Sequence, residues 1–223
     1  MDWPVFLQTC SAVVGASTFV YGVGAWRRNI IGQKRIDLAV QTIVAFLEIQ
    51  QAFREIRSPA SHAGEGTTRQ GRQGEDARDA EIGRMAYVAI ERINNRSEKF
   101  ITLAALRNQH HAYFGTVHLG PFNEADAVRM EIFRAALRLE VQWKKQGHQF
   151  RTEKEQEDHL AKMHAAEEVF WDSYADEDPL NPRIDKMVSE MESFCRQIIE
   201  PSPTFKAAVY SLCRTQRTFW FGR

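Results

Sequence analysis

The hydrophobic pattern of the chain begins with an uncharged run over residues 5–26, which ends at Arg27 and Arg28. A helix rises about 1.5 Å per residue, so a run of this length crosses a hydrocarbon core of roughly 30 Å. The run therefore predicts a transmembrane helix, and residues 1–28 form the predicted membrane anchor.

A cleaved signal peptide is the alternative interpretation of an apolar run at the N-terminus. It requires a basic start and a cleavage site with small residues. The chain starts with MDWP, which carries no Lys or Arg, and the run ends in Trp26 followed by two arginines. These features favour an anchor that is not removed.

Basic residues follow the run and are missing before it. Cytoplasmic segments next to a span carry an excess of Lys and Arg, so the N-terminus is predicted outside and the rest of the chain in the cytoplasm. Aromatic and basic residues near the ends of the span are expected to contact headgroups. They are Trp3, Trp26, Arg27, Arg28, Lys34 and Arg35.

Small residues within the run recur at steps of four and three, which places them along one stripe of a helix. They are Ser11, Gly15, Thr18, Gly22 and Ala25. Such stripes allow two helices to approach closely in lipid and therefore predict self-association of the span. The other interpretation is that single spans are rich in small residues without any role in assembly.

Apolar residues after the anchor also recur at steps of three and four, the pattern of helices with one buried face. Glycines, prolines and capping residues divide this pattern into helical segments over residues 29–57, 79–114, 121 or 123 to 146, 152–171 and 181–200. Thr152 with Glu155 forms a capping-box signature for the segment 152–171, and Asn181 as the capping residue before Pro182 starts the segment 181–200. The predicted fold class is all-α. It consists of an N-terminal transmembrane helix that continues into a cytoplasmic antiparallel helical bundle over residues 29–200, with a C-terminal tail over residues 201–223.

Residues 58–78 read SPASHAGEGTTRQGRQGEDAR and contain almost no apolar side chain. They predict a flexible polar loop. Residues 64–69 suggest a phosphate cradle, but a P-loop needs a Lys-Ser or Lys-Thr pair after its glycines, which is missing here. Arg57, Arg69 and Arg72 are expected to be exposed and to form a partner-binding loop for an anionic partner.

Acidic and basic residues balance at 29 each, which gives a formal net charge of +0. Nucleic-acid-binding domains are usually basic, so we expect no nucleic-acid partner. Cys10, Cys195 and Cys213 lack the spacing of a redox or zinc motif. Unpaired thiols of this kind are typical of a reducing compartment, in agreement with a cytoplasmic domain.

The histidines lack the spacing of a metal site, which on a helix requires ligands three or four residues apart. His110 and His111 are adjacent, and His159 and His164 are five apart. His164 has the correct spacing to Glu167 and Glu168, but a surface ion pair is the more common result.

The acidic stretch over residues 172–178 lacks the periodicity of a calcium loop, and we expect it to close a turn and to meet the loop arginines. The cysteines lie on helical patterns without the signature of a nucleophile. We therefore predict no metal, no cofactor and no catalytic residue.

Two segments resemble a known group of proteins. Residues 26–69, WRRNIIGQKRIDLAVQTIVAFLEIQQAFREIRSPASHAGEGTTR, and residues 174–185, YADEDPLNPRID, are similar to bacterial membrane-anchored helical proteins with a single span and no assigned activity. The resemblance covers most of the chain between the span and Glu200. It implies a bacterial origin, the inner membrane as location and a shared architecture, but no activity or cofactor.

Three classes of function remain. The first is a non-enzymatic, membrane-anchored interaction or scaffold module, whose partners are the bilayer and either a second copy or another membrane or cytoplasmic protein. The second is a membrane-disrupting effector, for instance in phage defence, in which associated spans permeabilise the bilayer. The third is an enzyme with a site in the bundle around His110, His164 or the acidic stretch. We rank them in this order.

Overall fold

The computed structural model describes residues 3–174 and 176–200, and the side chains of these residues except 3–17 and 20. Within these ranges the chain forms six helices and no strand, which confirms the predicted all-helical fold class. The predicted tail over residues 201–223 lies outside the described residues. The predicted roles of Trp3 at the membrane interface and of Ser11 and Gly15 in association fall on residues whose side chains are not described.

The chain divides into two compact units. One contains the first part of helix α1 (Trp3–Arg57), up to Val40, and the end of helix α6 (Asn181–Ile199) from Arg196. The other comprises Gln41–Cys195.

Helix α1 is a single helix of 55 residues, as the continuation of the anchor into the bundle predicted. Gly32 does not interrupt it. In its first part, Trp26, Arg27 and Arg28 are exposed, and the Arg28 guanidinium lies 6.0 Å from the centre of the Tyr21 ring. These exposed basic and aromatic side chains lie at the end of the uncharged run.

Among the described side chains, one helical stretch near the N-terminus, Tyr21–Arg57, is long and apolar enough to cross a membrane. In its most apolar window, 44% of the residues are buried inside the protein. Phe46, Ile49 and Phe53 of this stretch are core residues. The span predicted over residues 5–26 overlaps the stretch only at residues 21–26, and it remains a prediction.

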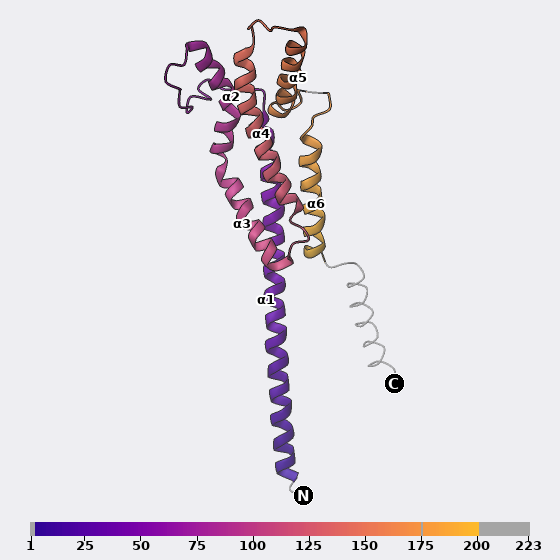
Figure 1. The fold of residues 1–223 in the computed structure, drawn as a ribbon. Helices are drawn as coiled ribbons and strands as arrows, with labels where there is room; N and C mark the ends of the chain where they lie inside the picture. Colours follow the sequence, from indigo (N-terminus) through magenta and orange to yellow (C-terminus); the bar gives the residue numbers. More distant parts are fainter. Residues whose placement is uncertain (1–2, 175, 201–223) are drawn as a thin grey trace. The chain divides into compact units, whose positions relative to one another are not determined.

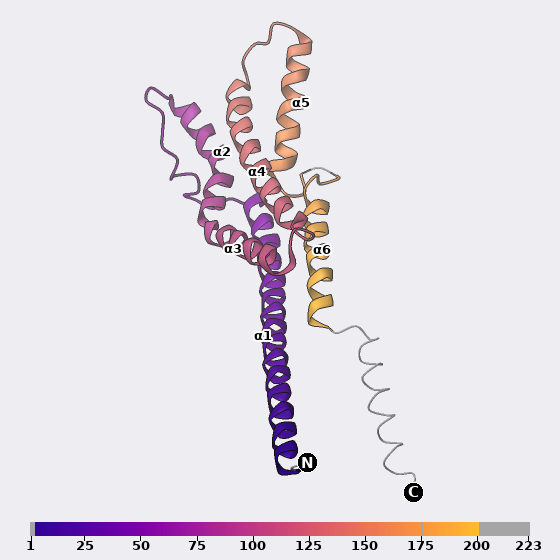
Figure 2. The ribbon, with the colours of Figure 1, turned by 60° about the horizontal axis from the view of Figure 1, so that its bottom comes forward.

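The unit Gln41–Cys195 is an antiparallel bundle (Figures 1 and 2). In both views α4 lies between α2 and α5, in agreement with close backbone contacts of α4 to both. Short connections join α2 to α3 and α3 to α4. The helices after α1 are α2 (Ala77–Asn95), α3 (Ser97–Phe114), α4 (Gly120–Lys145), α5 (Glu153–Phe170) and α6.

The second part of α1 provides the centre of this bundle. The Phe46 ring packs edge-on against Phe122 of α4, with centroids 5.0 Å apart. About two turns further along, Phe53 packs against Phe100 of α3 at 5.7 Å. Buried aromatic side chains contribute strongly to a core because each removes a large apolar area from water. Helix α1 therefore connects the predicted anchor directly to the core.

Two helix boundaries differ from the prediction. The helix predicted over residues 79–114 is divided into α2 and α3 at Arg96, which has φ −111° and ψ 15°. Asn94 and Asn95 precede it and favour helices weakly. The Arg96 guanidinium lies 2.7 Å from Glu55 of α1, so a tertiary ion pair holds the break in place.

The second difference concerns the start of α6. The sequence suggested Asn181 as the capping residue, but the Asp178 carboxylate accepts the backbone N–H groups of Leu180 and Asn181, at 2.9 and 2.8 Å. The Asn181 side chain is used elsewhere, as described below. By contrast, the predicted cap at Thr152 is confirmed, because its hydroxyl accepts the Glu155 N–H at 3.2 Å.

His110 of α3 is a polar residue inside the aromatic part of the core. It is 1% exposed, and the rings of Phe114, Phe122 and Phe194 lie around it with centroids 4.8 to 5.6 Å away. Its Nε2 atom has no hydrogen-bond partner. Burial, with a smaller contribution from the charge of His118, lowers the pKa of His110 to about 4.

This burial predicts a stability loss in mild acid. The unfolded chain binds a proton at His110 near pH 6.5, whereas the folded chain does so only near pH 4, so the free energy of unfolding falls as the pH decreases between these values. We expect a loss of about 3 kcal/mol. His110→Leu should remove this part of the pH dependence. Chemical denaturation at several pH values measures the free energy of unfolding of each variant. His111→Gln, an exposed neighbour, should retain it, and an equal slope in both variants would contradict the assignment.

Candidate functional site

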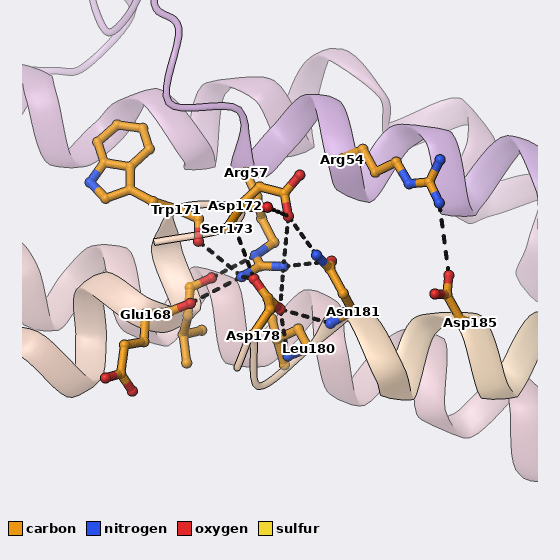
Figure 3. A network of polar contacts seen from close by, with 11 residues as sticks. Arg54, Arg57, Glu168, Trp171, Asp172, Ser173, Asp178, Leu180, Asn181 and Asp185 are labelled. Carbon is orange, nitrogen blue, oxygen red and sulfur yellow. Dashed lines mark hydrogen bonds and ion pairs between the residues drawn. The ribbon is translucent and has the colours of Figure 1, made fainter. Parts of the chain in front are cut away.

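A group of buried polar contacts lies where α1 ends (Figure 3). Arg57, the last residue of α1, is fully buried. Its guanidinium donates to three backbone carbonyl oxygens at the end of α5, those of Glu168, Val169 and Trp171, at 2.9 to 3.0 Å. The last carbonyl groups of a helix have no partner within the helix. Arg57 supplies that partner, and its positive charge suits the negative end of the α5 dipole.

Asp178 neutralises this buried cation. Its two carboxylate oxygens accept from Arg57 at 3.0 and 2.7 Å, in a bidentate pair. Burial alone would raise the pKa of Asp178, but the hydrogen bonds from Arg57 and from the backbone of Asn181 and Leu180 outweigh it and lower the pKa. The same carboxylate therefore holds the end of α1 and caps the start of α6.

Asn181 and Asp172 complete the cluster. The Asn181 side-chain oxygen accepts from Arg57 at 3.0 Å, and its amide nitrogen donates to Asp172 at 2.7 Å. The Asp172 backbone N–H donates to the Arg57 carbonyl at 2.7 Å. The end of α1, the end of α5 and the start of α6 are consequently joined at one point.

This arrangement corrects one expectation and supports another. Arg57 was expected to be exposed and available to a partner, but it is buried because it satisfies helix-end carbonyls and a carboxylate of its own chain. The acidic stretch was expected to close a turn and to meet the loop arginines. Asp172 and Asp178 meet Arg57 at the end of α1, whereas Arg69 pairs with Glu75 and Glu140, so the expectation holds for Arg57 alone.

A second buried arginine, Arg92 of α2, performs the same task for α1. It is 5% exposed and donates to the carbonyl oxygens of Glu55 and Ile56 at the end of α1 and to those of Ser58 and Ala60 beyond it, at 2.6 to 3.3 Å. Its carboxylate partner is Glu65 of the polar loop, at 2.7 Å. Arg92 thus fixes the first part of the loop to the end of α1.

Glu91, the neighbour of Arg92, holds the next part of the loop. Its carboxylate accepts from the Gly66 backbone N–H and, at 2.6 Å, from the Thr68 hydroxyl. The Thr68 hydrogen bond lowers the pKa of Glu91, with burial acting in the opposite direction. The loop donors that suggested a phosphate cradle are therefore occupied by a carboxylate of the chain itself.

The last part of the loop is held by a group of four charges. Arg69 pairs with Glu75 at 2.8 Å and with Glu140 of α4 at 2.9 Å, and Lys144 of α4 lies 2.9 Å from Glu75 and 3.2 Å from Glu140. The hydrogen bonds from Arg69 and Lys144 lower the pKa of Glu75. The side chain of Arg69 is 8% exposed, so it too was wrongly expected to be free, whereas that of Arg72 is 73% exposed.

Two glycines allow the loop to lie directly on α2. A Cβ atom on Gly66, which has φ +78°, would lie 2.3 Å from the Arg84 carbonyl oxygen. A Cβ atom on Gly83 of α2 would lie 2.4 Å from the centre of the Arg69 guanidinium. Both distances are shorter than any van der Waals contact. The Gly66 backbone therefore lies directly on the α2 backbone, and the Arg69 side chain lies directly on Gly83.

The loop, α2 and α4 line an open pocket of about 480 Å³. Its floor is apolar and consists of Ala86, Ile90, Phe133, Ala136 and Leu137. The polar loop side chains Thr68, Gln70 and Arg72 form one wall, together with the paired Arg69 and Glu140, and Tyr87 of α2 also lines it. Small-molecule sites commonly have this volume and this combination of an apolar floor with a few polar groups.

The other candidate residues from the sequence do not form a site. His164 Nδ1 lies 3.6 Å from Glu167, in the ion pair that its spacing indicated. The buried His159 contacts Gln142 at 2.8 Å and lies 17 residues of chain from it. Within residues 3–174 and 176–200, no three residues of the metal-ligating types cluster together.

The sequence did not predict the four charged residues of α2 and α4 that hold the loop, which are Glu91, Arg92, Glu140 and Lys144. Glu91 and Arg92 are flanked by the apolar residues Ile90 and Ile93, so they occupy the buried side of a helix. Charged residues are almost never buried without a partner. A pair of opposite charges at buried helix positions is therefore the signal that points to such a network.

Removal of the buried Arg57 side chain should strongly destabilise the protein. Arg57→Ala leaves Asp178 and three helix-end carbonyl groups buried without their partner, and we expect the free energy of unfolding to fall by about 3 to 5 kcal/mol. Arg54→Ala is the matched control, because Arg54 forms an exposed ion pair with Asp185 at 3.8 Å, and it should cost less than about 1 kcal/mol. Chemical denaturation of both variants measures the difference, and similar losses would contradict the assigned role.

Gly66→Ala should release the loop from α2. Gly64 also has a positive φ, +98°, but a Cβ atom there meets nothing within 4 Å, so Gly64→Ala has a comparable backbone strain without the clash. We expect tryptic cleavage after Arg69 and Arg72 to be about tenfold faster in Gly66→Ala than in Gly64→Ala, because cleavage follows local opening. Equal rates would show that the close contact with Arg84 does not hold the loop.

Comparisons with protein-family models, with curated proteins and with solved structures give no match for this chain. The similarity of residues 26–69 and 174–185 to bacterial membrane-anchored helical proteins therefore remains an expectation.

Proposed function

We propose that the protein is a single-pass protein of the bacterial inner membrane, with its N-terminus outside and its helical bundle in the cytoplasm. The bundle serves as a non-enzymatic interaction module, and the chain associates with a second copy through the span. Its partners are the bilayer, the second copy and a further membrane or cytoplasmic protein.

The observation that carries this proposal is the composition of α1. One helix contains the uncharged run, the exposed Arg27 and Arg28 directly after it, and the core residues Phe46 and Phe53. A helix without an interruption between a span and a core transmits a change of position more directly than a flexible linker does. This continuity supports a module whose bundle and anchor act together.

Exposed apolar side chains along α1 support self-association. They occur at alternating steps of four and three, first at Phe19, Val23, Trp26 and Ile30 and then at Val40, Val44 and Leu47. This spacing is typical of helices that pair along a seam, and this seam lies about 100° around the helix from the small-residue stripe that contains Gly22. The first group also suits lipid, whereas the second lies beyond the predicted span, where exposed apolar residues are better covered by protein. Gln33 and Asp37 occupy the intervening positions.

The test is the mass of the full-length protein in lipid nanodiscs, for the wild type, Gly22→Leu and Gly24→Leu. We expect an oligomer that Gly22→Leu weakens about tenfold or more, because leucine keeps two small stripes apart. A Cβ atom on Gly22 meets nothing within 4 Å, so this substitution does not disturb the single chain. Gly24 lies about 200° around the helix from Gly22, and Gly24→Leu should leave the oligomer unchanged.

The outcomes separate the two parts of the proposal. A wild-type protein that remains in the soluble fraction after cell lysis would contradict the anchor. A protein that resides in the membrane but is monomeric would contradict self-association and leave a third protein as the partner of the bundle.

A further inference from the structure

We propose that the pocket between the polar loop, α2 and α4 is a binding site for a small amphiphilic monoanion, a molecule with a flat or short apolar body and one carboxylate or similar acidic group. This inference goes beyond the proposed function and does not depend on the membrane anchor. It follows from the floor of the pocket, from the charge at its wall and from the way in which the loop is held.

The floor of the pocket exposes apolar surface that a ligand would cover. Ala86 and Ala136 are buried at its base, while Phe133 is half-buried and Leu137 is 45% exposed. Side chains this exposed at the bottom of a concave surface remain in contact with water in the free protein. An apolar body would remove this area from water, which is favourable in proportion to the area covered.

The charge at the wall selects an anion. Arg69 and Lys144 are engaged by Glu75 and Glu140, and Asp79, which does not line the pocket, lies 3.7 Å from Lys144. Arg72 is different, since its side chain is 73% exposed and its guanidinium lies 3.8 Å from Glu140, longer than a hydrogen bond. Arg72 therefore has donors to offer an additional carboxylate, and one such cation matches one negative charge.

Contacts with α2 and α4 fix the loop segment that presents Arg72 to the pocket. Arg92 and Glu91 hold the first half of the loop, Arg69 holds the second half to α4, and Gly66 lies directly on the α2 backbone. Ordering so many loop residues costs conformational entropy, and burying their charges costs desolvation energy. Long loops that are held in this way usually carry function. Here the loop closes one side of the pocket and positions Arg72 at it.

The experiment is equilibrium dialysis of the full-length protein in lipid nanodiscs against 2-naphthoate and against 2-naphthamide, with empty nanodiscs as the blank. The two probes share the same apolar body, and only naphthoate carries a charge. We expect saturable binding of one naphthoate per chain, with naphthamide bound more weakly. Arg72→Gln should weaken naphthoate binding about tenfold or more and leave naphthamide binding unchanged.

Two further variants complete the test. Arg134→Gln removes an exposed arginine of α4 that does not line the pocket, and it should leave the affinity for naphthoate unchanged. Leu137→Gln changes the exposed part of the floor and should weaken both probes about fivefold. Arg72 and Leu137 are exposed, so we expect all variants to retain the helical circular dichroism of the wild type.

Either of two results would overturn the proposal. One is that naphthoate does not bind above the blank. The other is that Arg72→Gln binds naphthoate as the wild type does, which would place the probe elsewhere. The oligomer measured in the absence of probe is unaffected by both results, so this test and that of the membrane-anchored module fail independently.

Discussion

The structure of the bundle depends on how the carbonyl ends of two helices are satisfied. Arg57 donates to the last carbonyl groups of α5, and Arg92 donates to those of α1. In each case the charge is balanced by a carboxylate from a connecting segment, Asp178 or Glu65. A buried guanidinium is favourable only when both its charge and its donors are matched, so each arginine also fixes the segment that supplies the match.

This requirement explains why charged side chains help to order the connections. The connection from α5 to α6 is held by Asp172, Asp178 and Asn181, and the polar loop is held by Glu65, Glu91 and Arg69 (Figure 3 shows the first of these networks). Each network is sensitive to the loss of any one partner, because the remaining charge stays buried. The same contacts give the loop a defined position over α2 and α4, and this position forms one side of the pocket.

Helix α1 relates the parts of the proposed function to one another. This single helix contains the uncharged run, the basic residues, the exposed apolar side chains and the core residues. Arg57, at its last position, joins it to α5 and α6. A partner or ligand that acts on the bundle therefore acts on a unit that contains the end of this helix, which is the physical basis for a module that responds to binding.

The sequence by itself determined the elements whose signals are local. The period of apolar residues gave the helices, and Thr152 with Glu155 marked the start of α5. The span over residues 5–26 remains a prediction. Tertiary structure decided the rest. The break at Arg96 depends on Glu55, and the burial of Arg57 and Arg69 depends on Asp178 and Glu140, which are 121 and 71 residues away. An arginine beside a polar loop looks exposed in the sequence, because local pattern does not reveal which distant carboxylate or helix end will meet it.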